Sequence, residues 1–148
     1  MSSLYMETTE IPPERTIAEI TTLLVKHGAT GIASKYEGGM VAAVMFQVPI
    51  GGREVPFKLP CRTEALFKVL HARRRQGYRH RWEEQDREQS KRVAWRQMLR
   101  WIQAQLALVE TGMVQIEEVF LPYLALRGGG TLYEKVAADQ FLQLEDQR

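Results

Sequence analysis

The sequence predicts an α+β fold: an N-terminal helix, a three-stranded antiparallel meander, and then a long amphipathic helix and a C-terminal helix that cover the sheet. Two observations carry this prediction. Two pairs of glycines separate three short runs of strand-forming residues, which is typical of consecutive β-hairpins. Further along the chain, apolar residues recur at alternating spacings of four and three, which is typical of one face of a long helix.

The first predicted helix opens at Pro12 and Pro13, because the amide that proline lacks has no partner in a first helical turn. Gly28 is expected to follow its C-terminus. Residues 1–11 are polar and are predicted to form a mobile arm, and residues 12–148 are predicted to form a single domain. The apolar face of the predicted helix that opens at Pro12 comprises Ile17, Ile20 and Leu24.

Three strands are predicted between residues 30 and 59, with tight turns at the glycine pairs 38–39 and 51–52. The third strand contains Pro56, which has no amide to donate to a neighbouring strand. We therefore expect this strand to lie at an edge of the sheet.

Two helices are predicted to follow the strands. Thr63 is expected to cap the N-terminus of the first, and Gly77 is expected to interrupt the helical segment. A long helix is then predicted over residues 82–111, ended by Gly112. Its apolar seam repeats like a heptad pattern and comprises Trp95, Leu99, Ile102, Leu106 and Val109.

The last part of the chain has a less regular pattern. Residues 113–127 are predicted to contain one helical turn and an extension of the sheet over residues 123–126. Thr131 and Glu134 have the spacing of a capping box, which starts a C-terminal helix through Leu144. The residues of this helix that are expected to face inward are Tyr133, Val136, Ala137 and Phe141.

The composition excludes several classes of protein. A hydrophobic fraction of 45% with 26% charged residues is typical of a folded globular chain rather than a disordered one. A single cysteine excludes an intramolecular disulfide framework, and no apolar run is long enough for a membrane helix. The first residues lack the features of a secretion signal, so we expect a cytoplasmic protein without membrane contact.

No catalytic constellation is recognisable, so we predict a protein that is not an enzyme and that uses no cofactor. The three histidines and Cys61 do not have the spacing of metal ligands, and no histidine is placed by sequence to act as a base for the thiol. Cys61 lies next to Arg62 and near a predicted helix start, an arrangement that can lower the pKa of a thiol. A buried thiol at the end of a strand is the favoured interpretation.

The charge distribution is the most informative feature for function. The chain has 20 basic and 18 acidic residues, which suggests an almost neutral protein. Residues 62–100, however, contain 12 basic residues against five acidic ones, and ten of the 12 are arginines. This window carries +7 and the rest of the chain −5, so the charge is strongly polarised along the sequence.

The densest basic segment, residues 73–82, interleaves five arginines with two aromatic residues. Guanidinium groups neutralise phosphates, and aromatic side chains stack on unpaired bases. We therefore predict a nucleic-acid-binding protein that favours single-stranded DNA, similar in role to phage-type single-strand binding or annealing factors. Replacing the three arginines at 73–75 by Glu is predicted to abolish binding with little loss of stability. The predicted contact residues are Arg73, Arg74, Arg75, Tyr78, Arg79, Arg81, Trp82, Arg92, Arg96 and Arg100. The last three continue the basic track along the long helix.

Two other interpretations of the basic segment stay open. In the first, the segment is a solvated helix junction whose arginines pair with nearby acids, namely Glu83, Glu84, Asp86 and Glu88. Helical spacing favours two i,i+4 pairs, Glu83 with Arg87 and Glu88 with Arg92, which do not use the arginines of residues 73–81. In the second, the protein is a phage or mobile-element accessory factor that binds a host protein. The seam of the long helix would then form an interface with that partner or within a homo-oligomer.

Residues 92–96, 101–113 and 118–124 resemble an uncharacterised family of small proteins from bacteria and their phages or mobile elements. The likeness runs over residues 16–133, with residues 57–60 as a second anchor. It implies no known activity.

The predicted order of elements resembles two nucleic-acid-binding folds. Double-stranded-RNA-binding domains have the same helix, three-stranded meander and helix, with a lysine cluster at the start of the second helix. Residues 61–64 occupy that place here, and the basic segment lies at the other end of the helix. Ring-forming single-strand annealing proteins of phage recombination have a similar core with a basic DNA groove beside the hairpin, which implies a DNA-binding role for residues 73–81.

Overall fold

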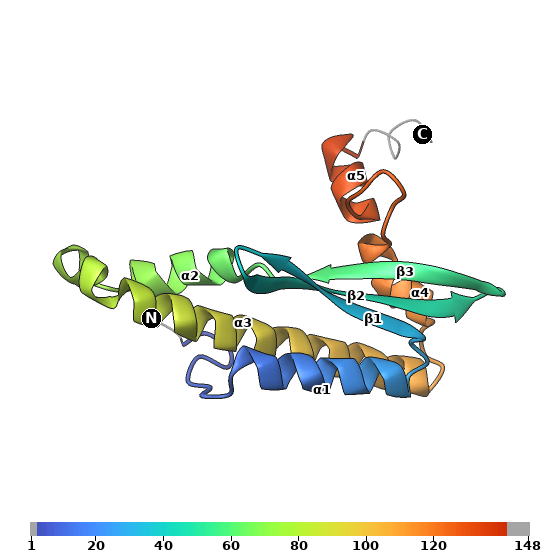
Figure 1. Cartoon of the computed structure of the whole chain (residues 1–148), viewed down its shortest axis with the longest axis horizontal. Coiled ribbons are helices and arrows are strands. Elements are labelled where there is room, and N and C mark those ends of the chain that lie inside the picture. Colours follow the sequence, from blue (N-terminus) through green and yellow to red (C-terminus); the bar gives the residue numbers. More distant parts are fainter. Residues whose placement is uncertain (1–2, 142–148) are drawn as a thin grey trace.

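The structure is a computed structural model that describes residues 3–141, and it confirms the predicted α+β class. An N-terminal helix leads into a sheet, a helical hairpin with one long helix follows, and short helices end the described chain (Figure 1). The elements are α1 (Pro13–Lys26), β1 (Gly31–Glu37), β2 (Met40–Ile50), β3 (Arg53–Pro60), α2 (Thr63–Ala72), η1 (Gln76–Tyr78), α3 (Arg79–Glu110), α4 (Ile116–Phe120), η2 (Leu121–Tyr123) and α5 (Leu132–Ala138).

The three strands form the predicted antiparallel meander, with β2 in the centre. In both hairpins the residues that flank the glycine pair are cross-strand partners, so each turn has two residues. The φ angles of the glycines at 38–39 are 58° and 79°, and those at 51–52 are 60° and 79°. Such two-residue turns require positive φ at both positions, which explains why the sequence has glycine there.

β3 is an edge strand, as Pro56 predicts. The segment after η2 covers part of this edge, because the amide of Ala125 donates to the carbonyl oxygen of Pro56 at 2.9 Å. Leu124 also forms an isolated bridge with Phe57. The predicted extension of the sheet over residues 123–126 is therefore present as this short contact.

α1 and α3 lie side by side and cover one face of the sheet (Figure 1). Side chains alternate between the two faces of a strand, and Val44, Phe46 and Val48 of β2 are buried toward the helices. The predicted apolar seam of α3 packs against these three side chains of β2. Its buried members are Trp95, Leu99, Ile102 and Leu106.

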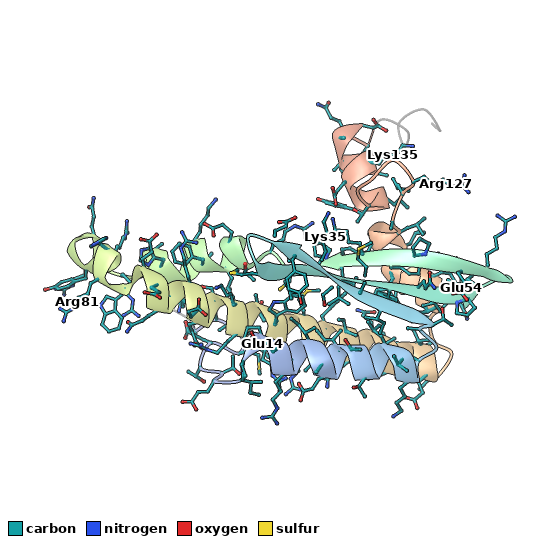
Figure 2. All side chains as sticks on the ribbon, in the orientation of Figure 1. Glu14, Lys35, Glu54, Arg81, Arg127 and Lys135 are labelled. Carbon is teal, nitrogen blue, oxygen red and sulfur yellow. The ribbon has the colours of Figure 1, made fainter. Side chains whose placement is uncertain are left out.

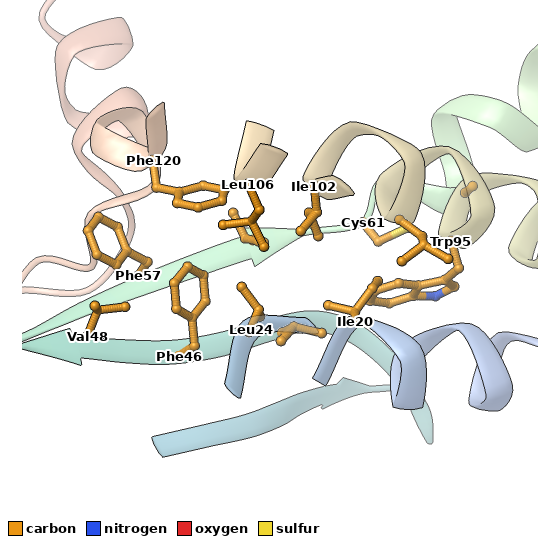
Figure 3. Packing of buried hydrophobic residues seen from close by; sticks show 14 residues of the cluster. Ile20, Leu24, Phe46, Val48, Phe57, Cys61, Trp95, Ile102, Leu106 and Phe120 are labelled. Atoms are coloured by element: carbon orange, nitrogen blue, oxygen red, sulfur yellow. The ribbon is translucent and has the colours of Figure 1, made fainter. Parts of the chain in front are cut away.

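The core joins the sheet to α1, α3 and α4 (Figure 3). Phe46 and Phe57 stack with their ring centroids 5.3 Å apart, and Phe120 of α4 meets Phe46 edge-on at 5.4 Å. Ile20 of α1 and Trp95 of α3 form the part of the core that lies toward α2. The core therefore extends along most of α3.

The boundaries of α2 and α3 differ from the prediction. Thr63 is the first residue of α2 rather than its cap, and Arg62 at the cap position makes no side-chain cap hydrogen bond. The interruption at Gly77 is confirmed, because this residue lies in η1. The turn there is short, so α3 begins at Arg79, earlier than the predicted residue 82.

The short helix α4 and the adjoining η2 confirm the predicted helical turn in this region. The cap of α5 is also confirmed, since the Thr131 hydroxyl accepts a hydrogen bond from the amide of Glu134 at 3.3 Å. α5 packs on η2 and stands apart from α1 and α3 in Figure 1.

The predicted length of the last helix is wrong. α5 ends at Ala138, because Gln140 and Phe141 have φ angles of 53° and 60°, which an α-helix does not allow. Residues 142–144 lie outside the described part of the chain. Tyr133 and Phe141, which were expected to face inward, are 49% and 46% exposed.

The described part of the predicted arm lies along α3. The side-chain amide of Gln89 donates to the carbonyl oxygens of Glu7 and Thr9 at 2.8 and 2.9 Å. Gln97 donates in the same way to Tyr5 at 2.8 Å. Residues 5–9 are thus hydrogen-bonded to the long helix. Within residues 3–141, no helix has both the length and the apolar character needed to cross a bilayer.

Candidate nucleic-acid interface

The basic segment forms the turn of a helical hairpin in which α2 and α3 pack against each other. This hairpin extends past the sheet, and Arg81 lies at its far end in Figure 2, whereas Arg127 and Lys135 lie in the C-terminal region. The structure therefore places the turn that contains the basic segment at a projecting end of the molecule.

A buried carboxylate holds the two helices of this hairpin together. Asp86 of α3 is 3% exposed. It accepts hydrogen bonds from Nε and Nη2 of Arg74 at 3.2 and 3.0 Å, and its Oδ2 lies 2.8 Å from Nδ1 of His71 on α2. Burial alone raises the pKa of Asp86, but the hydrogen bonds and charges of Arg74 and His71 outweigh it and hold the pKa below its ordinary value.

The charge of Arg74 is therefore balanced within the fold, although its side chain is 40% exposed, and Trp82 is half-buried. The guanidinium carbon of Arg74 lies 4.4 Å from the centre of the Trp82 ring, a cation–π contact that covers one face of the indole. Both residues contribute to the base of the hairpin, so we do not count them among the uncompensated residues of the candidate interface.

Arg73 also has a structural partner, because its guanidinium forms an ion pair with Glu7 of the N-terminal segment. Replacing Arg73, Arg74 and Arg75 together by Glu would break this pair and the pair with Asp86. The structure therefore leads us to expect a loss of stability in this variant, in contrast to the expectation from the sequence. The pair of Arg73 with Glu7 joins residues that are 66 positions apart, and sequence spacing does not reveal such a contact.

Arg79 stabilises the turn and still presents its charge. Its Nε donates to the carbonyl oxygen of Arg74 at 3.1 Å, and its Nη2 donates to that of Ala72 at 3.4 Å. These carbonyls belong to the C-terminal end of α2, where the helix dipole favours a cation. No carboxylate balances this charge in the described chain.

The exposed residues at the end of the hairpin form one group, which we call the tip. Tyr78 is 53% exposed, and its neighbours are exposed as well. Within residues 3–141, none of the three arginines of the tip lies within ion-pairing distance of a carboxylate. The tip comprises Arg75, Tyr78, Arg79, His80 and Arg81.

The basic track predicted along α3 is not continuous. Arg96 is 6% exposed and is turned toward α1, where it pairs with Glu19 and donates to the Thr16 hydroxyl at 3.3 Å. Arg92 is half-buried and donates to Gln89, whereas Arg100 is exposed and donates to Gln103. We therefore remove Arg96 from the candidate interface, and Arg92 and Arg100 do not join the tip.

Local ion pairing along α3 agrees only partly with the sequence pattern. Arg87 pairs with Glu83 at 3.4 Å, as predicted, and also with Glu64 of α2 at 2.8 Å. The prediction of an ion pair between Glu88 and Arg92 is wrong, because Glu88 pairs with Lys91 at 2.7 Å.

The seam that would have formed an interface with a second molecule is used within the chain. Trp95, Leu99 and Ile102 are 1–2% exposed and belong to the core between the sheet and α1. Trp101 is half-buried and makes edge-on ring contacts with Phe120 and Tyr123. The structure therefore removes the seam as a basis for an interface.

Cys61 is the free thiol that the sequence predicts to be buried, and its exposure is 6%. Burial raises the pKa of this thiol to about 12. We expect the native protein to react slowly with a thiol reagent at pH 8, because only about one thiol in ten thousand is then ionised. Reaction with Ellman's reagent in buffer and in denaturant measures this. Equal rates in the two conditions would contradict the buried position.

The described residues contain no group of three or more His, Cys, Asp or Glu side chains arranged to hold a metal ion. Comparisons of the chain with protein-family models, with curated proteins and with solved structures found no match. The resemblance to small bacterial and phage proteins therefore stays a prediction.

Proposed function

We propose that this protein is a non-catalytic nucleic-acid-binding protein that contacts its ligand through the tip of the α2–α3 hairpin, with single-stranded DNA favoured. The observation that carries this proposal is the exposure of Arg75, Arg79 and Arg81 at a projecting end of the molecule, without carboxylate partners in residues 3–141. Uncompensated arginines of this kind bind the phosphate backbone.

The aromatic residue of the tip supports the preference for unpaired bases. Tyr78 is 53% exposed and lies between Arg75 and Arg79 in the chain. Stacking on an aromatic ring contributes about 1–3 kcal/mol per base and requires a base that is not already stacked in a duplex. Tyr78 therefore favours a single strand, whereas the arginines bind either form.

The base of the hairpin holds these side chains in place. Arg79 is fixed by two carbonyl oxygens, and Asp86 ties α3 to both Arg74 and His71. A tip on such a base loses less conformational freedom on binding than a flexible loop would.

A triple substitution, Arg75→Glu, Arg79→Glu and Arg81→Glu, tests the proposal. We expect binding of a fluorescent single strand to fall by at least about 100-fold at low salt, and the slope of log affinity against log salt to fall by about 2 units, since each phosphate contact contributes about 0.7. Fluorescence anisotropy at several salt concentrations measures both quantities.

The matched control makes the same change of charge elsewhere, with Arg15→Glu, Arg53→Glu and Arg127→Glu. These three arginines are exposed, and no ion pair is recorded for them within residues 3–141. We expect the control to reduce binding much less, through net charge only. Equal losses in the two variants, or no binding by the unaltered protein at low salt, would overturn the proposal.

A further inference from the structure

A second basic site lies at the other end of α2, between this helix and the sheet. A cavity of about 760 Å³ opens there, with a largely apolar wall that includes Val41, Ala43 and Val69. Three cationic side chains line it, and we call the site the basic pocket. They are Lys58 of β3, Arg62 before α2, and Lys68 of α2.

A fourth cation stands beside the pocket. Lys35 of β1 is the cross-strand partner of Ala43, and Lys58 of β3 is the partner of Met45. Ala43 and Met45 alternate with Val44 and Phe46, which point to the core, so both lysines lie on the face of the sheet turned away from α1 and α3. The nearby ammonium group of Lys35 and partial burial lower the pKa of Lys58. Two lysines are thus held close together, an arrangement that an anion between them would stabilise.

The acids around the pocket do not cancel these charges. Glu64 lines the pocket, but its carboxylate pairs with Arg87 at 2.8 Å. Glu37 also lines the pocket, and Glu134 of α5 acts on Lys58 from a distance. Lys35, Lys58, Arg62 and Lys68 together still exceed these carboxylates in charge.

We propose that the basic pocket binds a phosphate group. Ammonium and guanidinium groups that line one cavity match the charge and the acceptor oxygens of a phosphate. The phosphate could belong to the backbone of the strand held by the tip, which rests on the proposed function, or to a free phosphate compound. Both sources share the same chemistry, and the experiment has one arm for each.

The first arm uses pyrophosphate and inorganic phosphate as probes. We expect either probe at millimolar concentration to shift the side-chain NMR signals of Lys58 and to raise its pKa, because a bound anion favours the charged ammonium. The double variant Lys35→Gln and Lys58→Gln is expected to weaken pyrophosphate binding about tenfold or more. The control variant, Lys26→Gln and Lys135→Gln, changes two exposed lysines outside the pocket and is expected to bind as the unaltered protein does.

The second arm measures single-strand binding of the same two variants. If the strand crosses the pocket, the loss of Lys35 and Lys58 lowers the salt slope by about 1.4 units, twice the contribution of one phosphate contact. A lower slope in this variant but not in the control identifies the strand as the source of the phosphate. Pyrophosphate binding with an unchanged slope identifies a free phosphate compound.

The two arms of the experiment distinguish a failure of the basic-pocket proposal from a failure of the tip proposal. If the tip variant shows that the proposed function is wrong, the pyrophosphate measurement still tests the basic pocket independently. The inference is overturned if neither probe shifts the Lys58 signals and the pocket variant has the salt slope of the control.

Discussion

Replacing Asp86 by alanine is expected to lower the free energy of unfolding by about 3 kcal/mol, because it removes the acid of a buried ion pair. Asp86 is 3% exposed and binds Arg74 and His71, which belong to the other side of the hairpin. Its loss leaves these two groups without their acceptor in a partly buried place. Urea unfolding followed by circular dichroism measures the change.

The control for this variant is Glu84→Ala, which removes an exposed acid from the same helix. We expect it to change the free energy of unfolding by less than about 0.5 kcal/mol. Similar values for the two variants would show that Asp86 contributes no more than a surface charge.

The same carboxylate makes stability depend on pH. Because the folded-state pKa of Asp86 is lowered from its ordinary value of 3.8, its contribution is present in full above the unfolded-state pKa and is lost as the pH falls through the folded-state pKa. The stability difference between the unaltered protein and Asp86→Asn is therefore expected to be constant above about pH 5 and to shrink at lower pH. A difference that grows on acidification would contradict the lowered pKa.

Replacing Phe120 by alanine is expected to lower the free energy of unfolding by about 4 kcal/mol. The side chain is fully buried, and its ring contacts Phe46 of β2 and Trp101 of α3 with centroid distances of 5.4 and 5.7 Å. The substitution opens a cavity where α4 joins the sheet to the long helix. Thermal or urea unfolding measures the loss.

The neighbouring residue offers a matched control, since Leu121 is 48% exposed and Leu121→Ala is expected to cost about 1 kcal/mol or less. The tip lies at the opposite end of the molecule from α4 (Figure 1), so the folded Phe120→Ala variant is expected to bind single strands as the unaltered protein does. A loss of binding without unfolding would contradict this separation of core and tip.

Local patterns were enough to predict most of the fold. The glycine pairs at 38–39 and 51–52 specify two-residue turns, and Pro56 specifies an edge strand, because each acts through the backbone of its own segment. The spacing of Trp95, Leu99 and Ile102 likewise marks the buried face of α3, since helical periodicity reports which residues share a face.

The candidate site could be predicted only in part. The sequence located the basic segment, and Arg75, Tyr78, Arg79 and Arg81 are exposed there. The sequence placed Asp86 among the acids expected to pair with these arginines, but it did not show that this carboxylate is buried or that Arg74 is its partner.

The sequence by itself determined the order and type of the main secondary-structure elements and the polarised charge, because both depend on residues close together in the chain. Only the tertiary structure decided which arginines are available. Arg73 pairs with Glu7, 66 residues away, and Arg96 pairs with Glu19, 77 residues away. Charge counts treat all arginines alike, whereas folding neutralises those that meet a distant carboxylate and leaves the tip uncompensated.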